Sequence, residues 1–229
     1  MKLSIVIPVY NECRTIERIL DAVAASPVAD KEIIVVDDFS SDGTRELLPG
    51  LAGKYAKLVL HEKNQGKGAA IRSGLKEASG DVVIIQDADL EYDPTDYARL
   101  LEPIENGQAD VVYGSRFLNR DGFKHAPHRL NRLANRGLTV FSNMLSGFKL
   151  TDMETCYKMM RREIVAKIVL EENRFGFEPE ITAKLAKLDI RLLELPISYR
   201  GRTHDEGKKI GWSDGVRTLY AIVKYNVFR

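Results

Sequence analysis

The sequence predicts an α/β protein with a Rossmann-like, mostly parallel central sheet flanked by helices. Three observations lead to this prediction: apolar runs of strand length recur along the chain, helical segments lie between them, and polar residues cluster where the runs end. Strands that alternate with helices are typical of βαβ units. Because ligands bind beyond the carboxyl ends of the strands in such sheets, the polar clusters mark the expected site.

The expected elements follow one another in a regular order. Strands are predicted at residues 3–9, 33–36, 57–60, 110–114 and 191–197, and another begins at Val82. Helices are predicted at residues 15–25, 44–51, 66–78, 128–146 and 178–188, and others open near Pro94 and at Ser213. The first helix has apolar residues at a period of 3.6, namely Ile16, Ile19, Leu20 and Val23. The polar segment 120–127 is expected to be a mobile loop.

The composition excludes several classes of protein. A chain of 229 residues with 44% hydrophobic and 29% charged residues is typical of a soluble globular domain. The net charge of +1 provides no basic excess for a nucleic-acid backbone, so we expect no nucleic-acid partner. Cys13 and Cys156 are too few for a disulfide framework, which indicates a reducing compartment. No apolar run approaches the roughly 20 residues of a membrane span, so we expect a cytoplasmic protein, at most peripheral at the cytoplasmic face of a membrane.

Asp87-Ala88-Asp89 is the most informative motif. It closes the apolar run 82–85, and residues two apart in an extended segment point to the same face, so the two carboxylates emerge together. Two such anions repel each other unless a cation lies between them. Mg²⁺ usually takes one or two carboxylates and leaves its other positions to phosphate and water. The motif therefore predicts a divalent ion that carries substrate phosphates, with a solvated turn as the alternative.

Polar residues also follow three other predicted strands. Tyr10-Asn11-Glu12 follows the first strand, Asp37-Asp38 the second, and Ser115-Arg116 the strand at 110–114. Because parallel strands end at the same edge of a sheet, we expect one rim that carries acids for a metal or a base and a cation for phosphate.

Several features leave alternatives open. Gly66-Lys67-Gly68 matches neither a Walker A loop nor a dinucleotide fingerprint; its glycines permit a tight turn, and Lys67 could reach a phosphate. The segment 199–209 is either a solvated charge run or a lid that closes on a diphosphate. The terminal segment 213–229 is an amphipathic helix that packs on the domain or lies on a membrane surface. The four histidines show no metal-ligand spacing.

Taken together and in this order, the motifs resemble those of family 2 glycosyltransferases with the GT-A (nucleotide-diphospho-sugar transferase) fold. The residues that carry the resemblance are Ile7-Pro8-Val9-Tyr10-Asn11-Glu12, the segment 35–44, Asp87-Ala88-Asp89 and Gly114-Ser115-Arg116. Within the family, the chain is most similar to the dolichol-phosphate mannosyltransferase and polyprenyl-phosphate glycosyltransferase branch. The resemblance implies a catalytic domain at 1–212, with a nucleotide-sugar half at 1–116 and an acceptor half at 117–212, followed by the helix 213–229 and no transmembrane segment.

The resemblance also implies roles for individual residues. The nucleotide base and ribose would be held by Pro8, Tyr10, Glu12, Val36 and Asp38. Mg²⁺ or Mn²⁺ and the diphosphate would be held by Asp87 and Asp89, with Ala88 contributing backbone and Glu91 a further ligand. Arg202 and Lys208 would close on the donor diphosphate. The acceptor phosphate would meet Arg116 and a basic helix whose register is open among Arg129, Arg132 and Arg136. Asp89, Arg116 and Asp152 are the predicted catalytic residues.

The implied reaction is the transfer of a hexose from GDP-mannose or UDP-glucose to a polyprenyl or dolichyl phosphate, with inversion. The alternative is a hydroxyl of a soluble, glycan or protein acceptor, which would need a carboxylate base; Asp152 and Glu178 are the candidates. A sugar nucleotidyltransferase would be expected to have a Gly-rich loop where Asn11-Glu12-Cys13-Arg14 stands, and a non-catalytic binding module would lack the carboxylate pair. The Gln-x-x-Arg-Trp signature is missing, which argues against a polymerising enzyme.

Overall fold

The computed structural model of the protein describes residues 1–118, 129–201 and 212–228. A sheet of seven strands forms the centre of this described part, in the order β3-β2-β1-β4-β6-β5-β7. All neighbouring strands are parallel except β6, which runs antiparallel to both β4 and β5. The strands are β1 (Leu3–Val9), β2 (Lys31–Asp37), β3 (Lys57–Leu60), β4 (Val82–Ile85), β5 (Val111–Ser115), β6 (Lys158–Arg161) and β7 (Leu192–Pro196).

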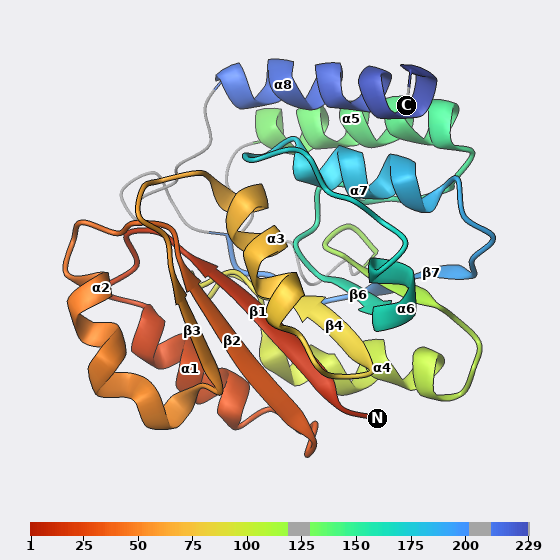
Figure 1. Ribbon diagram of the computed structural model, residues 1–229. Helices are drawn as coiled ribbons and strands as arrows, with labels where there is room; N and C mark the ends of the chain where they lie inside the picture. Colours follow the sequence, from red (N-terminus) through yellow and green to blue (C-terminus); the bar gives the residue numbers. More distant parts are fainter. Residues whose placement is uncertain (119–128, 202–211, 229) are drawn as a thin grey trace.

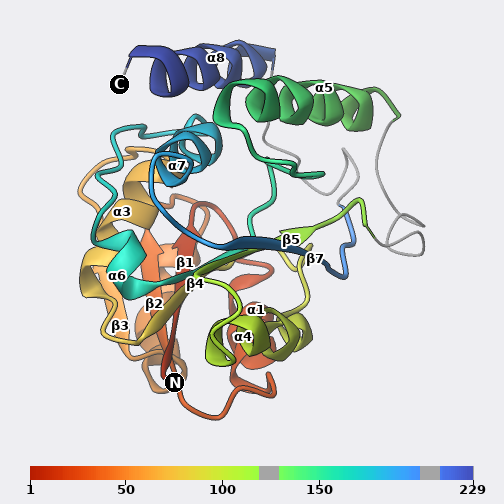
Figure 2. The same cartoon turned by 90° about the vertical axis from the view of Figure 1, so that its right-hand side faces the viewer.

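Helices cover both faces of this sheet (Figures 1 and 2). α1 (Ile16–Ala24) and α4 (Tyr97–Glu105) lie on one face, and α3 (Lys67–Glu77) lies on the other. α7 (Phe177–Leu185) is overlaid by α5 (Arg129–Ser146) and α8 (Trp212–Val223), which lie side by side. The short helices α2 (Thr44–Leu47) and α6 (Arg162–Val165) complete the set. 3₁₀ turns span Leu48–Lys54 and Pro94–Asp96, and a π-helical turn spans Lys224–Phe228. Among the described residues, none of these helices has both the length and the apolar character needed to cross a bilayer.

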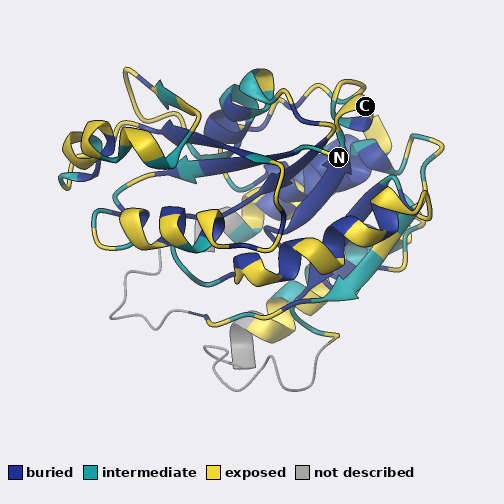
Figure 3. Ribbon diagram, turned by 90° about the horizontal axis from the view of Figure 1, so that it is seen from below, coloured by how far each residue is buried: buried dark blue, intermediate teal, exposed yellow. Residues whose placement is uncertain are grey.

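The alternation of side chains along β1 explains the two cores. Leu3, Ile5 and Ile7 pack with α1 and α4, whereas Val6 points the other way and packs with Ala70 of α3. Both sets are fully buried, and Figure 3 shows the buried strands enclosed between helices whose outer faces are exposed. This arrangement confirms the predicted α/β architecture, and the helix predicted from Ile16, Ile19, Leu20 and Val23 buries those four residues.

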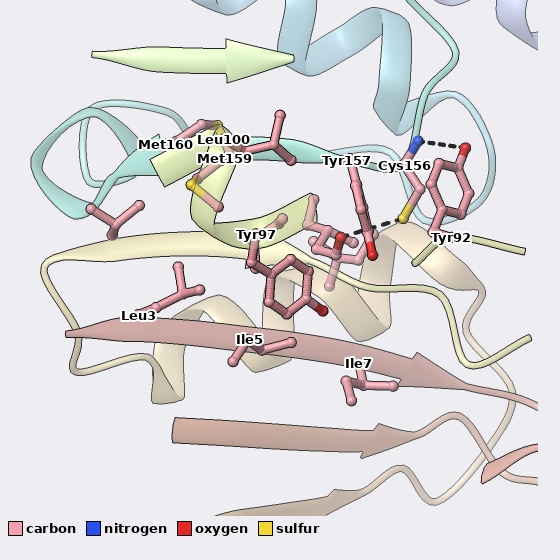
Figure 4. Close-up of a cluster of buried hydrophobic side chains, with 14 of the residues drawn as sticks. Leu3, Ile5, Ile7, Tyr92, Tyr97, Leu100, Cys156, Tyr157, Met159 and Met160 are labelled. Carbon is pink, nitrogen blue, oxygen red and sulfur yellow. Dashed lines mark hydrogen bonds between the residues drawn. The ribbon is translucent and has the colours of Figure 1, made fainter. Parts of the chain in front are cut away.

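A buried group of tyrosines fixes the end of β4. In Figure 4, Tyr97 and Tyr157 lie over the β1 side chains, and Tyr92 accepts a hydrogen bond from the backbone N–H of Cys156 at 3.0 Å. The hydroxyls of Tyr97 and Tyr157 both donate to Oε1 of Gln86, at 2.5 and 2.6 Å. Gln86 directly precedes Asp87, so these hydrogen bonds anchor the backbone from which the carboxylate motif emerges.

β6 and α6 were not predicted from the sequence. β6 consists of Lys-Met-Met-Arg, which lacks the β-branched residues and the alternation that indicate a strand. The helix predicted at 44–51 ends at Leu47 and continues as a 3₁₀ turn, which has Pro49 in its first turn. The loop predicted at 120–127 lies outside the described residues.

Candidate active site

The strand order brings the four polar strand ends to one rim. β2, β1 and β4 are parallel neighbours, and β5 runs in the same direction because β6 is antiparallel to both β4 and β5, so residues 10–12, 37–38, 87–89 and 115–116 all leave the sheet at the same edge. Hydrogen bonds join the loops that follow β1 and β2: the backbone N–H of Asn11 donates to Ser40 Oγ at 2.9 Å, and that of Ser41 donates to Asn11 Oδ1 at 2.8 Å. The expected rim is therefore present.

Backbone strain concentrates at this rim. Asn11, Phe39 and Leu90 are the non-glycine residues with positive φ in the described chain, with φ of 54°, 66° and 65°. Each lies just beyond a different rim strand, namely β1, β2 and β4. A non-glycine residue in this region costs on the order of 1–3 kcal/mol and persists where the surrounding structure requires it, which is common at functional sites. The strain thus marks the same edge as the polar residues.

The predicted nucleotide-side residues differ in how accessible they are. Tyr10 is exposed, Pro8 is partly exposed, and Glu12 is nearly buried with its Oε2 accepting from the Thr15 hydroxyl at 2.7 Å. Val36 is fully buried in the core beside α3, so only its backbone can reach a ligand.

Asp38 organises the turn that precedes α3. Its carboxylate accepts from the backbone N–H of Gln65 at 2.9 Å and from that of Gly66 at 2.7 Å, and it contacts His61 Nδ1 at 2.7 Å. The side chain is buried, and these three contacts tie the end of β2 to the start of α3. Gly66 itself has φ of +99°, as the predicted tight turn requires.

Asp87 already faces a cation. Lys67 Nζ lies 2.7 Å from Asp87 Oδ1 and 3.6 Å from Glu178 Oε1, so the ammonium lies between the end of β4 and α7. Asp89 Oδ1 accepts from the backbone N–H of Glu91 at 3.1 Å, and Ala88 is buried between the two carboxylates. The sequence places Lys67 in a tight turn from which it could reach a phosphate; the structure adds its contact with Asp87.

A hard divalent ion fits the donor set at the end of β4. Asp87 and Asp89 offer carboxylate oxygens, the ligands that Mg²⁺ and Mn²⁺ prefer, and the Lys67 contact shows that Asp87 attracts positive charge. Within the described ranges, no three His, Cys, Asp or Glu side chains form a metal-ligating group. A metal here would thus take its remaining ligands from water, or from water and a diphosphate. The predicted ligand Glu91 accepts from the Tyr199 hydroxyl at 2.7 Å, and its role as a ligand stays a prediction.

Arg116 and Asp152 form a two-point ion pair at the end of β5. Nε of Arg116 lies 2.7 Å from Oδ2 of Asp152, and Nη2 lies 2.7 Å from Oδ1. Asp152 is fully buried, and the guanidinium also lies over the ring of Tyr199 at 5.2 Å. The loop that carries Asp152 is held by Glu194 of β7, which accepts the backbone N–H of Thr151 at 2.8 Å. Sequence reasoning missed Glu194, because its role depends on the parallel register of β5 and β7.

The remaining predicted residues are the arginines of α5 and the pair Arg202 and Lys208. Arg132 and Arg136 are exposed on α5, whereas Arg129 begins the helix and its side chain is not described. Arg202 and Lys208 lie outside the described residues, so their closing on a diphosphate stays a prediction.

Two further carboxylates each have a buried oxygen. Oε2 of Glu178 and Oε1 of Glu154 are buried and have no hydrogen-bond partner. Burial raises the pKa of Glu178, and the Lys67 ammonium opposes that shift. Burial also raises the pKa of Glu154, and the Glu178 charge adds to the shift. Glu154 was not singled out from the sequence, where it is one more acid in a polar loop.

Comparison with known protein families identifies the class of protein, a glycosyltransferase with the GT-A fold. The sequence model of Glycosyl transferase family 2 matches residues 4–169, and the chain belongs to that family.

Individual proteins are similar over most of the chain. A dolichol-phosphate mannosyltransferase of Pyrococcus furiosus is 30% identical over 230 residues, which cover 98% of this chain and 64% of that protein. An undecaprenyl-phosphate 4-deoxy-4-formamido-L-arabinose transferase of Aeromonas hydrophila is 32% identical, with 96% and 66% covered. An undecaprenyl-phosphate mannosyltransferase of Micrococcus luteus is 30% identical, with 92% and 88% covered. The chain thus spans just under two thirds of the length of the first two relatives.

A solved structure shares the fold. Glucosyl-3-phosphoglycerate synthase from Mycobacterium tuberculosis, in complex with Mn²⁺, uridine diphosphate and glucosyl-3-phosphoglycerate, superposes with a TM-score of 0.73. The sequences are 22% identical, and the match covers 98% of this chain and 80% of that one.

Proposed function

We propose that the protein transfers a hexose from a nucleotide diphosphate to a polyprenyl or dolichyl phosphate, with inversion at the anomeric carbon. The observation that carries the proposal is the presence on one rim of the Asp87–Asp89 motif and the Arg116–Asp152 pair. The first suits a diphosphate with its cation, and the second presents a guanidinium to an anionic acceptor. The names of the relatives from Pyrococcus, Aeromonas and Micrococcus support a lipid-phosphate acceptor.

The donor would lie across the ends of β1, β2 and β4. Exposed Tyr10 and partly exposed Pro8 offer surface for the base, and Glu12 and the backbone near Val36 and Asp38 offer polar groups for base and ribose. GDP-mannose and UDP-glucose are both candidate donors.

Different residues would act on the leaving group and on the acceptor. Mg²⁺ or Mn²⁺ held by Asp87 and Asp89, when bound, would offset the charge that develops on the departing diphosphate. Arg202 and Lys208 would add positive charge there. A phosphate acceptor is already anionic at neutral pH, so it needs placement beside Arg116 and the α5 arginines Arg132 and Arg136 rather than a base.

The outer face of α5 and α8 supports a lipid acceptor and a peripheral location at the cytoplasmic face of a membrane. The two helices lie side by side (Figure 1), and both expose large apolar side chains, namely Leu133, Val140 and Met144 on α5 and Val216, Leu219 and Tyr220 on α8. Arg132 and Arg136 are exposed on the same α5 helix. Apolar side chains mixed with basic ones suit the boundary of an anionic bilayer.

Transfer to a hydroxyl is the second candidate, and Glu178 is the observation in its favour. Its carboxylate is buried, its Oε2 has no partner, and its pKa is raised, all of which suit a group that accepts a proton. Asp152 suits this role less, because Arg116 occupies both of its oxygens.

An acceptor comparison tests the proposal. The purified protein is incubated with GDP-mannose or UDP-glucose, Mg²⁺ or Mn²⁺, and either undecaprenyl phosphate or simple sugars, and products are identified by mass spectrometry. We expect one of the two donors to give hexosyl undecaprenyl phosphate and the simple sugars to give no product. Transfer to sugars alone, lost in Glu178→Gln, would reject the lipid-phosphate proposal in favour of the second candidate.

A further inference from the structure

Lys67 lies between two carboxylates that come from different layers of the molecule. Its ammonium is 2.7 Å from Asp87 Oδ1, at the end of β4, and 3.6 Å from Glu178 Oε1, in α7. The side chain is mostly buried, and Nζ lies 5.6 Å from the centre of the Phe177 ring. The ammonium therefore has two anions within reach and is in close contact with only one of them.

The backbone on either side of Lys67 is held in place. A Cβ at Gly66 would come within 2.4 Å of the Asn173 carbonyl oxygen, so the two chains are in close contact there. The backbone N–H of Gly66 donates to Asp38, and that of Ala69 donates to Asn173 at 3.1 Å. Because these contacts fix the turn, a change in the position of the ammonium has to come from the Lys67 side chain alone.

Glu178 has unused capacity for a cation. Its Oε2 is buried without a hydrogen-bond partner, and its Oε1 is 3.6 Å from the ammonium, longer than a hydrogen bond. A buried carboxylate oxygen without a donor is unfavourable, so a closer ammonium would stabilise Glu178. Asp87, in contrast, is the carboxylate that a divalent ion would need.

We propose that Lys67 is an internal counter-ion for Asp87 that yields this carboxylate to the incoming divalent ion and moves its ammonium onto Glu178. The inference rests on the proposed function, because it takes Asp87 as a metal ligand. An ammonium and a divalent ion repel each other at one carboxylate, so each weakens the binding of the other. Lys67 and Glu178 are then positioning residues that set how tightly the site holds a metal before the donor arrives.

We call this movement of the Lys67 ammonium from Asp87 to Glu178 the relay. It is tested by titrating the full-length protein with Mn²⁺ in the absence of donor and measuring the free ion by electron paramagnetic resonance. In Lys67→Met the ammonium is absent, and we expect Mn²⁺ to bind at least fivefold more tightly than in the wild type. Lys67→Arg, which keeps the charge, should return the affinity to within about twofold of the wild type. Lys63→Met removes an exposed lysine from the same loop and should change the affinity less than twofold.

A double-mutant cycle separates the relay from simple charge removal. Glu178→Gln takes away the second anion, so the ammonium stays at Asp87 and Mn²⁺ should bind at least threefold more weakly. In the Lys67→Met background the same substitution should have less than half of that effect. An undiminished effect of Glu178→Gln in that background, or unchanged Mn²⁺ affinity in Lys67→Met, would overturn the relay.

The outcomes also distinguish the relay from the function on which it rests. Mn²⁺ binding that is lost in Asp89→Asn, together with glycosyl transfer but no response to Lys67→Met, would reject the relay and leave the proposed function standing. No Mn²⁺ binding with or without GDP or UDP, and no transfer, would overturn both. Circular dichroism of each variant confirms that the comparison is made between folded proteins.

Discussion

The carboxylate of Asp152 binds both the side chain and the backbone of Arg116. Besides the two contacts to the guanidinium, Oδ2 of Asp152 accepts the backbone N–H of Arg116 at 3.0 Å. A single buried carboxylate thus fixes both the end of β5 and the direction in which its arginine points.

Asp152→Asn is expected to disable the Arg116 side of the rim. The substitution leaves a largely buried guanidinium without its counter-charge, and breaking a buried pair in this way typically costs about 3–5 kcal/mol. We expect lower stability in urea and at least a hundredfold loss of transfer. Arg116→Lys keeps the charge without the two-point geometry, so it should retain more stability while KM for the lipid phosphate rises. Normal turnover in Asp152→Asn would contradict this role.

Asp89→Asn is expected to abolish transfer without unfolding the protein. Asp89 is partly exposed beyond the end of β4, outside the apolar core, so the change should leave the melting temperature within a few degrees. Asp93→Asn is the matched control: it removes a carboxylate four residues along the chain, and asparagine can still cap Thr95. Transfer rates and Mn²⁺ titration of both variants provide the measurement, and turnover in Asp89→Asn would reject the metal assignment.

Glu154→Gln is expected to change how stability depends on pH. Burial raises the pKa of Glu154 to about 8, with Glu178 adding to the shift. Between the ordinary carboxyl pKa of about 4.3 and this value, the folded state binds a proton that the unfolded state has lost, so stability falls as pH rises. Glu154→Gln removes this contribution. The free energy of unfolding of Glu154→Gln should therefore rise relative to that of the wild type as pH increases from 5 to 8, by on the order of 1–3 kcal/mol.

Urea unfolding at pH 5, 6.5 and 8 measures this slope. Glu163→Gln, on the exposed surface of α6, serves as the matched control for the loss of one carboxylate. An identical pH dependence in Glu154→Gln and the wild type would show that Glu154 titrates normally.

Gly68→Ala is expected to destabilise the turn that carries Lys67. A Cβ there would lie 2.2 Å from the Glu172 carbonyl oxygen, so the backbone must shift. We expect a loss of about 1–3 kcal/mol, as for other overpacked sites, together with reduced transfer. Gly53→Ala is the control, because a Cβ at Gly53 meets nothing within 4 Å and should change stability by less than about 0.5 kcal/mol. Equal melting temperatures for the two variants would contradict the close packing.

The exposed face of α5 and α8 is expected to bind anionic vesicles. Met144→Glu and Val216→Glu place charges on its apolar surface and should reduce co-sedimentation with phosphatidylglycerol vesicles severalfold, while activity on a short-chain, water-soluble polyprenyl phosphate is retained. Val169→Glu changes an equally exposed apolar residue outside these helices and should have no effect. Binding that survives both substitutions would place the membrane contact elsewhere.

Much of the fold could be predicted because apolar runs and helical periods are local signals. The strand at 3–9 and the rim residues at its end and at the ends of β2, β4 and β5 follow from such runs. β6 could not be predicted, because Lys158 is buried by contacts with the carbonyl oxygens of Met153 and Thr155 that only the folded loop provides.

The site was less predictable than the fold for a related reason. The spacing of Asp87 and Asp89 is visible in the sequence, but the pairing of Asp87 with Lys67 joins residues twenty positions apart. Val36 was assigned to the donor site by resemblance, and its side chain proves to be core. Such pairings and orientations depend on tertiary register, which a local pattern does not encode.

The antiparallel strand β6 sets the distance between two parts of the site. It separates β4 from β5, and at about 4.8 Å per neighbouring strand the two are roughly 10 Å apart. Because β6 is antiparallel to β4 and β5, its amino end lies at the edge where their carboxyl ends lie. The segment that precedes β6, which contains Asp152, is therefore at the same edge as the segments that follow β4 and β5. The leaving group at the end of β4 and the acceptor at the end of β5 would thus be separated by the width of one strand, and this separation is set by the strand order rather than by any one side chain.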